Sequence, residues 1–296
     1  MISGVFAASI TPLNQDFSPD LEFLPRYLGH LADRGCQGAL ILGTTGEGPS
    51  FSPAQRLAIF QSALEVKRQR PEFQLLAGTG TPSLDETAEL TRKAFDLGID
   101  GVVILPPFYF RNSGDEGLFS WYQKIIMSSV PRDGITLAYH IPAVSGVPLS
   151  IDLISRLHDA APDKFIGLKD SSGDRDYSHQ LGDRFGDDLR VFTGSDRLFT
   201  EAVQNNAVGC ITALANLISP DLNELWIALQ ADSPTDQIQE RINSYREVCE
   251  QFQPFPPLIK FLVSKFFDFP LWPVCPPLMN LSKKAGDRVS TMLDLA

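Results

Sequence analysis

Lys169 stands near the end of an apolar run, in the segment FIGLKDSS at 165–172. The run predicts a short buried strand that leads into a polar turn. Burying an ammonium ion is costly, so a lysine is seldom placed in such a strand for stability alone. Burial lowers the pKa of an amine, and a neutral amine can attack a carbonyl carbon and form a Schiff base. The alternative is a strand-end lysine that keeps its amine in water.

Other residues that could react with or bind a substrate follow apolar runs elsewhere in the chain. The GTTGE motif at 43–47 offers two hydroxyls and closely spaced backbone N–H groups, which suit a small carboxylate. Tyr109 and Tyr139 end two further runs, and Asp196 and Arg197 end another. If these runs are strands of one parallel barrel, an amine, two phenols and an anion cradle meet on one rim, where barrel enzymes place their active sites.

The chain contains eight such runs, at 5–12, 39–45, 75–81, 101–107, 135–142, 165–172, 191–196 and 209–214. Most lack an alternating pattern, which is typical of parallel strands covered on both faces. Helical segments separate them, and two begin with capping signals, Ser52 with Gln55 and Ser83 with Glu86. The alternation predicts an α/β protein with a (β/α)8 TIM barrel over residues 1–232. A doubly wound sheet is the alternative, but no Gly-rich dinucleotide turn follows the first run.

Residues 233–296 come after the eighth β/α unit and contain no clear strand. Proline-rich segments at 254–257 and 276–277 separate stretches of helical character, and the aromatic content is high. We therefore expect a C-terminal helical extension that packs on the barrel or on a neighbouring subunit.

The net charge of −11 argues against nucleic acid or an anionic membrane as the main partner. No apolar run approaches membrane-spanning length, and no basic residue precedes Arg26, so we expect a cytoplasmic protein. The four cysteines form no CxxC pair and are expected to be free thiols. The histidines are scattered, and we expect neither a metal ion nor an organic cofactor.

Three motifs in this order are highly specific: GTTGE at 43–47, Tyr139 with Pro142 and Gly146, and GLKDSSGD at 167–174. With them the chain resembles the dihydrodipicolinate synthase / N-acetylneuraminate lyase family of pyruvate-dependent class I aldolases, from about residue 4 to at least residue 216. The resemblance implies a TIM barrel, a covalent imine with pyruvate as the only "cofactor", and a homodimer or homotetramer.

The resemblance also assigns roles to residues. It implies that Lys169 is the Schiff-base nucleophile, that Tyr139 shuttles protons, and that Thr44 belongs to the hydroxyl relay. Thr45 and neighbouring backbone amides would hold the pyruvate carboxylate, and Tyr109 matches a family tyrosine that reaches a neighbouring subunit's site. The remaining predicted substrate-binding residues are Gly43, Ser171, Gly194, Asp196, Arg197, Val144 and Ile211.

The identity of the aldehyde depends on where this chain departs from the family. Dihydrodipicolinate synthases have an arginine at the position of Val144, and an isopropyl group cannot form its salt bridge with a carboxylate. Sialate lyases have an acidic residue where Arg197 stands and a serine where Ala213 stands. The leading prediction is a lyase that joins pyruvate to an aldehyde, or releases it, with a 2-keto-3-deoxy sugar acid as the adduct.

Five alternatives remain. Three share this chemistry: 4-hydroxy-tetrahydrodipicolinate synthase, N-acetylneuraminate lyase and 4-hydroxy-2-oxoglutarate aldolase. The fourth is a catalytically silent barrel that binds a 2-oxo acid, against which the intact lysine, tyrosine and threonine set argues. The fifth is a phosphate-binding metabolic barrel that works through a metal and acid/base residues, which predicts that chelators abolish its activity.

Arg197 and Asp196 each have two interpretations. A cation in the first turn of a helix is disfavoured by the helix dipole, so Arg197 could be retained to bind an acidic end of the substrate. It could equally face solvent behind an Asp196 N-cap. Asp196 is then either that cap or a ligand for substrate hydroxyls.

Overall fold

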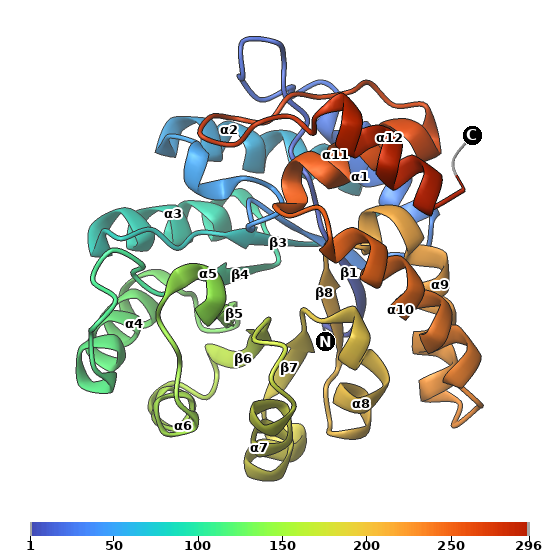
Figure 1. Ribbon diagram of the computed structural model, residues 1–296. Helices are drawn as coiled ribbons and strands as arrows, with labels where there is room; N and C mark the ends of the chain where they lie inside the picture. Colours follow the sequence, from blue (N-terminus) through green and yellow to red (C-terminus); the bar gives the residue numbers. More distant parts are fainter. Residues whose placement is uncertain (1, 295–296) are drawn as a thin grey trace.

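The computed structural model describes residues 2–294 and shows a closed barrel of eight parallel strands surrounded by helices (Figure 1). Each strand pairs with the next along the chain, and β8 closes the barrel against β1. The predicted (β/α)8 TIM barrel is confirmed. The strands are Gly4–Ala8 (β1), Gly38–Ile41 (β2), Gln74–Gly78 (β3), Gly101–Ile104 (β4), Ile135–His140 (β5), Phe165–Asp170 (β6), Arg190–Thr193 (β7) and Gly209–Thr212 (β8).

The predicted runs extend past the ends of the observed strands, because the chain leaves the sheet before each run is over. After β2, for example, Leu42 and Glu47 adopt positive φ angles of 55° and 57°, which turn the backbone into a compact loop. The polar residues that end each run therefore lie in loops at the C-terminal rim of the barrel.

Helices alternate with the strands as predicted. They are Leu24–Asp33 (α1), Pro53–Ala63 (α2), Leu84–Leu97 (α3), Asp115–Ser129 (α4), Pro142–Ser145 (α5), Ile151–Ala160 (α6), Arg175–Phe185 (α7), Phe199–Gln204 (α8) and Ala215–Gln230 (α9). The capping box of Ser52 and Gln55 is confirmed. The segment before α8 is a 3₁₀ turn, Asp196–Leu198 (η4), so this helical stretch is α-helical only over α8.

The core has two layers. Large apolar side chains fill the inside of the barrel, among them Phe6 and Phe192, whose rings meet edge to face with centroids 5.4 Å apart. A second layer lies between the strands and the surrounding helices. Because the interior is filled, the strands form a rigid platform, and chemistry is confined to the rim.

The C-terminal extension consists of Asp236–Glu250 (α10), Phe255–Phe267 (α11) and Lys283–Met292 (α12). In Figure 1, α10 lies beside α9, and α11 and α12 lie near α1. Aromatic rings join the extension to α1: Phe23 meets Trp272 with ring centroids 5.1 Å apart, and Tyr27 meets Phe269 at 5.8 Å. The extension thus packs on the barrel. No helix within residues 2–294 combines the length and apolar character needed to cross a bilayer.

Candidate active site

Lys169 and Tyr139 occupy paired positions on the neighbouring strands β6 and β5. Because they are in register, their side chains project from the same face of the sheet and meet. Lys169 Nζ donates a hydrogen bond of 3.1 Å to the Tyr139 hydroxyl, which lies 3.3 Å from Thr44 Oγ1. Lys169 is only 3% exposed, so the alternative of an amine in bulk water is wrong. We call Lys169, Tyr139 and Thr44 the hydroxyl–amine cluster.

The electrostatic setting of Tyr139 makes its phenol easier to deprotonate than an ordinary tyrosine. Burial raises the pKa of the Tyr139 phenol, but the charge of Lys169 and hydrogen bonds from Thr44, Lys169 and Ser171 outweigh burial. The pKa therefore lies below the ordinary value for tyrosine. A phenol poised in this way beside an amine can pass protons to and from a group bound at that amine.

The loop after β2 brings the GTTGE motif beside this cluster. The Glu47 N–H donates to the Thr44 carbonyl at 3.1 Å, and the Gly48 N–H donates to the Gly43 carbonyl at 3.1 Å, so the loop is a closed turn. A cavity of about 30 Å³, the size of a water molecule, is lined by Gly43, Thr44 and Tyr139 among others. Thr45 is buried within the same loop.

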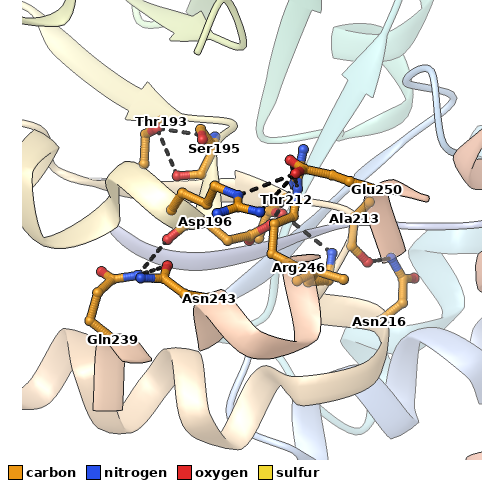
Figure 2. Close-up of polar contacts among 12 residues, drawn as sticks. Thr193, Ser195, Asp196, Thr212, Ala213, Asn216, Gln239, Asn243, Arg246 and Glu250 are labelled. Carbon is orange, nitrogen blue, oxygen red and sulfur yellow. Dashed lines mark hydrogen bonds and ion pairs between the residues drawn. The ribbon is translucent and has the colours of Figure 1, made fainter. Parts of the chain in front are cut away.

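A second group of polar residues lies at the ends of β7 and α10, and Figure 2 shows its contacts. The buried Asp196 accepts a hydrogen bond of 2.7 Å from Arg246 Nη1, and Arg246 Nε donates to Glu250 Oε1 at 2.7 Å. Arg197 Nη2 lies 3.0 Å from the other Glu250 oxygen. We call Asp196, Arg197, Arg246 and Glu250 the charged cluster.

This geometry corrects the predicted N-cap role of Asp196. Asp196 is the first residue inside the 3₁₀ turn η4, whose N-cap is Ser195, and no side chain caps that turn. The carboxylate turns toward Arg246 instead, because a charge buried completely needs an opposite charge beside it.

Two further predicted residues lie close together at the rim. A Cβ atom at Gly194 would lie 2.0 Å from Ser171 Oγ, so the approach of Ser171 to the end of β7 requires a glycine there. Ser171 is partly buried and bonded through its backbone N–H to the His140 carbonyl.

Four predicted residues have no recorded contact with the Lys169 amine in the part of the chain that the structure describes. Tyr109 is 76% exposed and stacks edge to face on Phe110, and Val144 is 59% exposed. Arg197 is half-exposed and paired with Glu250, and Ile211 is packed inside the barrel. Within this single chain, none of the four is placed to touch the reacting amine by any contact that the structure records for residues 2–294.

Sequence reasoning missed two residues, Arg246 and Lys260, that the extension contributes to the rim. Lys260 had a recognisable signal, a lone charge within the apolar stretch PPLIKFLV, whereas Arg246 lies on a helix rich in charges. Both are bonded to carboxylates of rim loops, Asp196 and Glu47.

No three His, Cys, Asp or Glu side chains within residues 2–294 are grouped closely enough to hold a metal ion. His140, the histidine nearest the cluster, accepts a hydrogen bond from the Leu149 N–H at 3.3 Å. Burial lowers the pKa of His140 to about 4, so at neutral pH its ring is uncharged. Its ring packs against Tyr177 of α7, with ring centroids 4.2 Å apart.

Comparisons with known proteins agree with this geometry. The sequence model of the dihydrodipicolinate synthetase family matches residues 1–296. An uncharacterized DapA-like lyase of Chloroflexus aurantiacus is 36% identical over 282 residues, which cover 95% of this chain and 92% of the relative.

Two solved structures share the whole architecture. The 4-hydroxy-tetrahydrodipicolinate synthase of Methylacidiphilum fumariolicum SolV superposes with a TM-score of 0.90 at 26% identity, covering 99% of this chain and 95% of the other. YagE of Escherichia coli K12, solved in complex with pyruvate, gives a TM-score of 0.91 at 22% identity over 100% of both chains and shows the shared fold alone. The chain belongs to the dihydrodipicolinate synthetase family, and the protein is a lyase of that family.

Proposed function

We propose that this lyase works through an imine between Lys169 and pyruvate, and that it makes or cleaves the carbon–carbon bond of a 2-keto-3-deoxy sugar acid. The observation that carries the proposal is the buried Lys169 amine, 3.1 Å from a phenol whose pKa is lowered. A simple ion pair or a packing role would not require this arrangement, because neither needs an amine beside a proton carrier.

The reaction would begin with attack of the Lys169 amine, after it has given up a proton, on C2 of pyruvate. Two protons pass to the C2 oxygen, which leaves as water, and the C=N bond of the imine forms. Loss of a C3 proton gives an enamine, whose C3 attacks the aldehyde carbon while the aldehyde oxygen takes a proton. Water then hydrolyses the imine and frees the amine. Tyr139, bonded to the amine and to Thr44, is placed to carry these protons.

The loop at 43–47 would hold the substrate carboxylate. Thr45 follows Thr44, whose hydroxyl contacts Tyr139, and closely spaced backbone N–H groups in such loops bind anions. Thr44 would then connect the carboxylate-binding loop to the proton carrier, because its hydroxyl reaches the Tyr139 phenol.

The preference for a sugar acid rests on what the rim offers to the aldehyde end. Val144 provides no cation, and Arg197 already has a carboxylate partner, Glu250. Ser171, which hydrogen-bonds to Tyr139, and Ser195 carry hydroxyl groups and are only partly buried. Such a rim suits hydroxyls better than a second carboxylate.

The test is reductive trapping. We expect borohydride with pyruvate to add a reduced pyruvyl group to the peptide that contains Lys169, as measured by mass spectrometry. The Lys169→Met variant, which removes the amine and keeps a flexible apolar chain, should stay unlabelled. A parent protein left unmodified would instead indicate the silent 2-oxo-acid-binding barrel. Release of pyruvate from a panel of 2-keto-3-deoxy acids would then identify the aldehyde.

We also propose that Tyr109 completes the site of a second copy in a dimer or tetramer, because Tyr109 is 76% exposed beside Phe110, which is 70% exposed. Coexpressing Lys169→Met and Tyr109→Phe chains tests this. Mixed dimers would contain one intact site and regain activity that neither variant has alone. If the mixture stayed as inactive as its parts, Tyr109 would act within its own chain or not at all.

A further inference from the structure

Lys260 is a buried charge that the proposed reaction does not use. It lies on α11, and its side chain is 1% exposed. Its Nζ donates to Glu47 Oε1 at 2.5 Å and to the Pro273 carbonyl at 2.6 Å. The other Glu47 oxygen accepts from the Cys275 N–H at 2.7 Å. The C-terminal extension therefore donates hydrogen bonds to both carboxylate oxygens of Glu47 in the rim loop.

Glu47 is the last residue of the GTTGE motif, so these contacts hold the loop that carries Thr44 and Thr45. The Glu47 backbone has a φ of 57°, a left-handed conformation that a non-glycine residue adopts only when its surroundings hold it. Its N–H closes the turn onto the Thr44 carbonyl at 3.1 Å. A displacement of Glu47 would thus pass directly to Thr44.

The barrel holds the same loop from below. Thr11 Oγ1 donates to the Gly46 carbonyl at 2.7 Å. A Cβ atom at Gly48 would lie 2.0 Å from the Leu42 carbonyl oxygen, so the loop is packed tightly against the end of β2. The loop is thus held on one side by the barrel and on the other by the extension, and the contact with the extension includes the Lys260–Glu47 ion pair.

We propose that Lys260 is a positioning residue for the 2-oxo-acid carboxylate: through Glu47 it fixes the loop whose Thr45 and backbone N–H groups receive that carboxylate. This inference rests on the proposed function. A misplaced binding loop weakens capture of every 2-oxo acid, while the amine and phenol, which lie on β6 and β5, keep their geometry. The pyruvate concentration needed for half-maximal imine trapping should rise far more than the maximal rate falls.

The informative variant removes both charges together. Lys260→Met alone leaves Glu47 as an unpaired buried carboxylate, which risks misfolding. In the double variant Glu47→Gln/Lys260→Met no charge is stranded, and the Gln amide oxygen can still accept from the Cys275 N–H. A control at a second, partly exposed lysine–carboxylate pair is Lys67→Met. It removes a Lys–Asp pair with Asp100, at 2.5 Å, that lies just before β4 at the opposite end of the barrel.

The experiment is borohydride trapping at Lys169 over a range of pyruvate concentrations, with thermal unfolding followed by circular dichroism. We expect the double variant to raise the half-saturating pyruvate concentration by about tenfold or more and to lower the maximal trapping rate by less than about threefold. Lys67→Met should change neither value, whatever it does to stability.

Each of the other outcomes contradicts either the positioning role of Lys260 or the proposed function. A folded double variant that saturates with pyruvate like the parent contradicts the positioning role and leaves the proposed function intact. Equal changes in the double variant and in Lys67→Met show a general loss of stability and also contradict it. Absence of trapping in the parent contradicts the proposed function itself, and the role of Lys260 with it.

Discussion

The hydroxyl–amine cluster and the charged cluster share the rim of one barrel but use their polar groups differently. In the first, the members come from the ends of β5 and β6 and from the loop after β2, contact each other at 3.1 to 3.3 Å, and form no ion pair with a carboxylate of residues 2–294. In the second, each charged side chain has an opposite charge beside it, and two of the four come from α10. The amine and phenol on β6 and β5 are therefore not neutralised by a carboxylate. The charged side chains after β7 are paired with charges on α10 and hold the extension to the barrel.

The largest effect expected from this contrast concerns stability. Arg246→Met would leave Asp196 buried without its cation, and such losses typically lower the free energy of unfolding by about 3 to 5 kcal/mol. Imine trapping at Lys169 should persist in the folded variant, because the amine contacts Tyr139 and not the charged cluster. Chemical denaturation measures the first quantity and mass spectrometry the second.

The control for this prediction is Asp196→Asn/Arg246→Met, in which no buried charge is left alone. It should recover much of the lost stability, because the cost arises from the stranded carboxylate. If Arg246→Met were as stable as the parent, or if it lost trapping while folded, the two clusters would not be separate in function.

The sequence predicted the first cluster because its residues stand in short motifs at strand ends. Once eight runs are recognised as parallel strands, barrel closure brings Thr44, Tyr139 and Lys169 to one rim regardless of their distance along the chain. The charged cluster offered no such rule. Asp196 and Arg246 are 50 residues apart, and their pairing depends on how α10 docks beside η4, which periodicity does not specify.

The same reasoning explains why the sequence predicted only part of the loop after β2. GTTGE predicted an anion cradle from its own hydroxyls and glycines, but not the partner of Glu47. Lys260 is 213 residues away and reaches Glu47 only because α11 packs over the rim. A lone lysine in an apolar helix signals a buried partner, yet only the fold tells which carboxylate it meets.

A smaller effect is expected within the hydroxyl–amine cluster. Thr44→Val keeps the shape of the side chain and removes one of the hydrogen bonds that lower the pKa of Tyr139. The pKa should therefore rise toward its ordinary value. If the phenolate is the base, the acid limb of the rate profile moves to higher pH, and a shift of one unit corresponds to about tenfold in rate on that limb.

Pyruvate release measured as a function of pH tests this, and ultraviolet titration against Tyr139→Phe follows the phenol itself. A shift of the profile to lower pH would contradict the sign. An unchanged profile with a uniformly lower rate would indicate that Thr44 orients the substrate and does not tune the phenol.

The smallest effect is expected at Arg197, on the solvent side of the charged cluster. Arg197 and Glu250 are 40% and 38% exposed, and pairs of this kind contribute about 1 kcal/mol or less. Arg197→Ala removes one partner of Glu250, which keeps its bond to Arg246. Activity on substrates that end in a hydroxyl, a carboxylate or a phosphate should thus change little and equally, as rates on the three would show. A loss confined to the two anionic substrates would mean that Arg197 exchanges Glu250 for substrate, and the charged cluster would then take part in recognition as well as in fastening the extension.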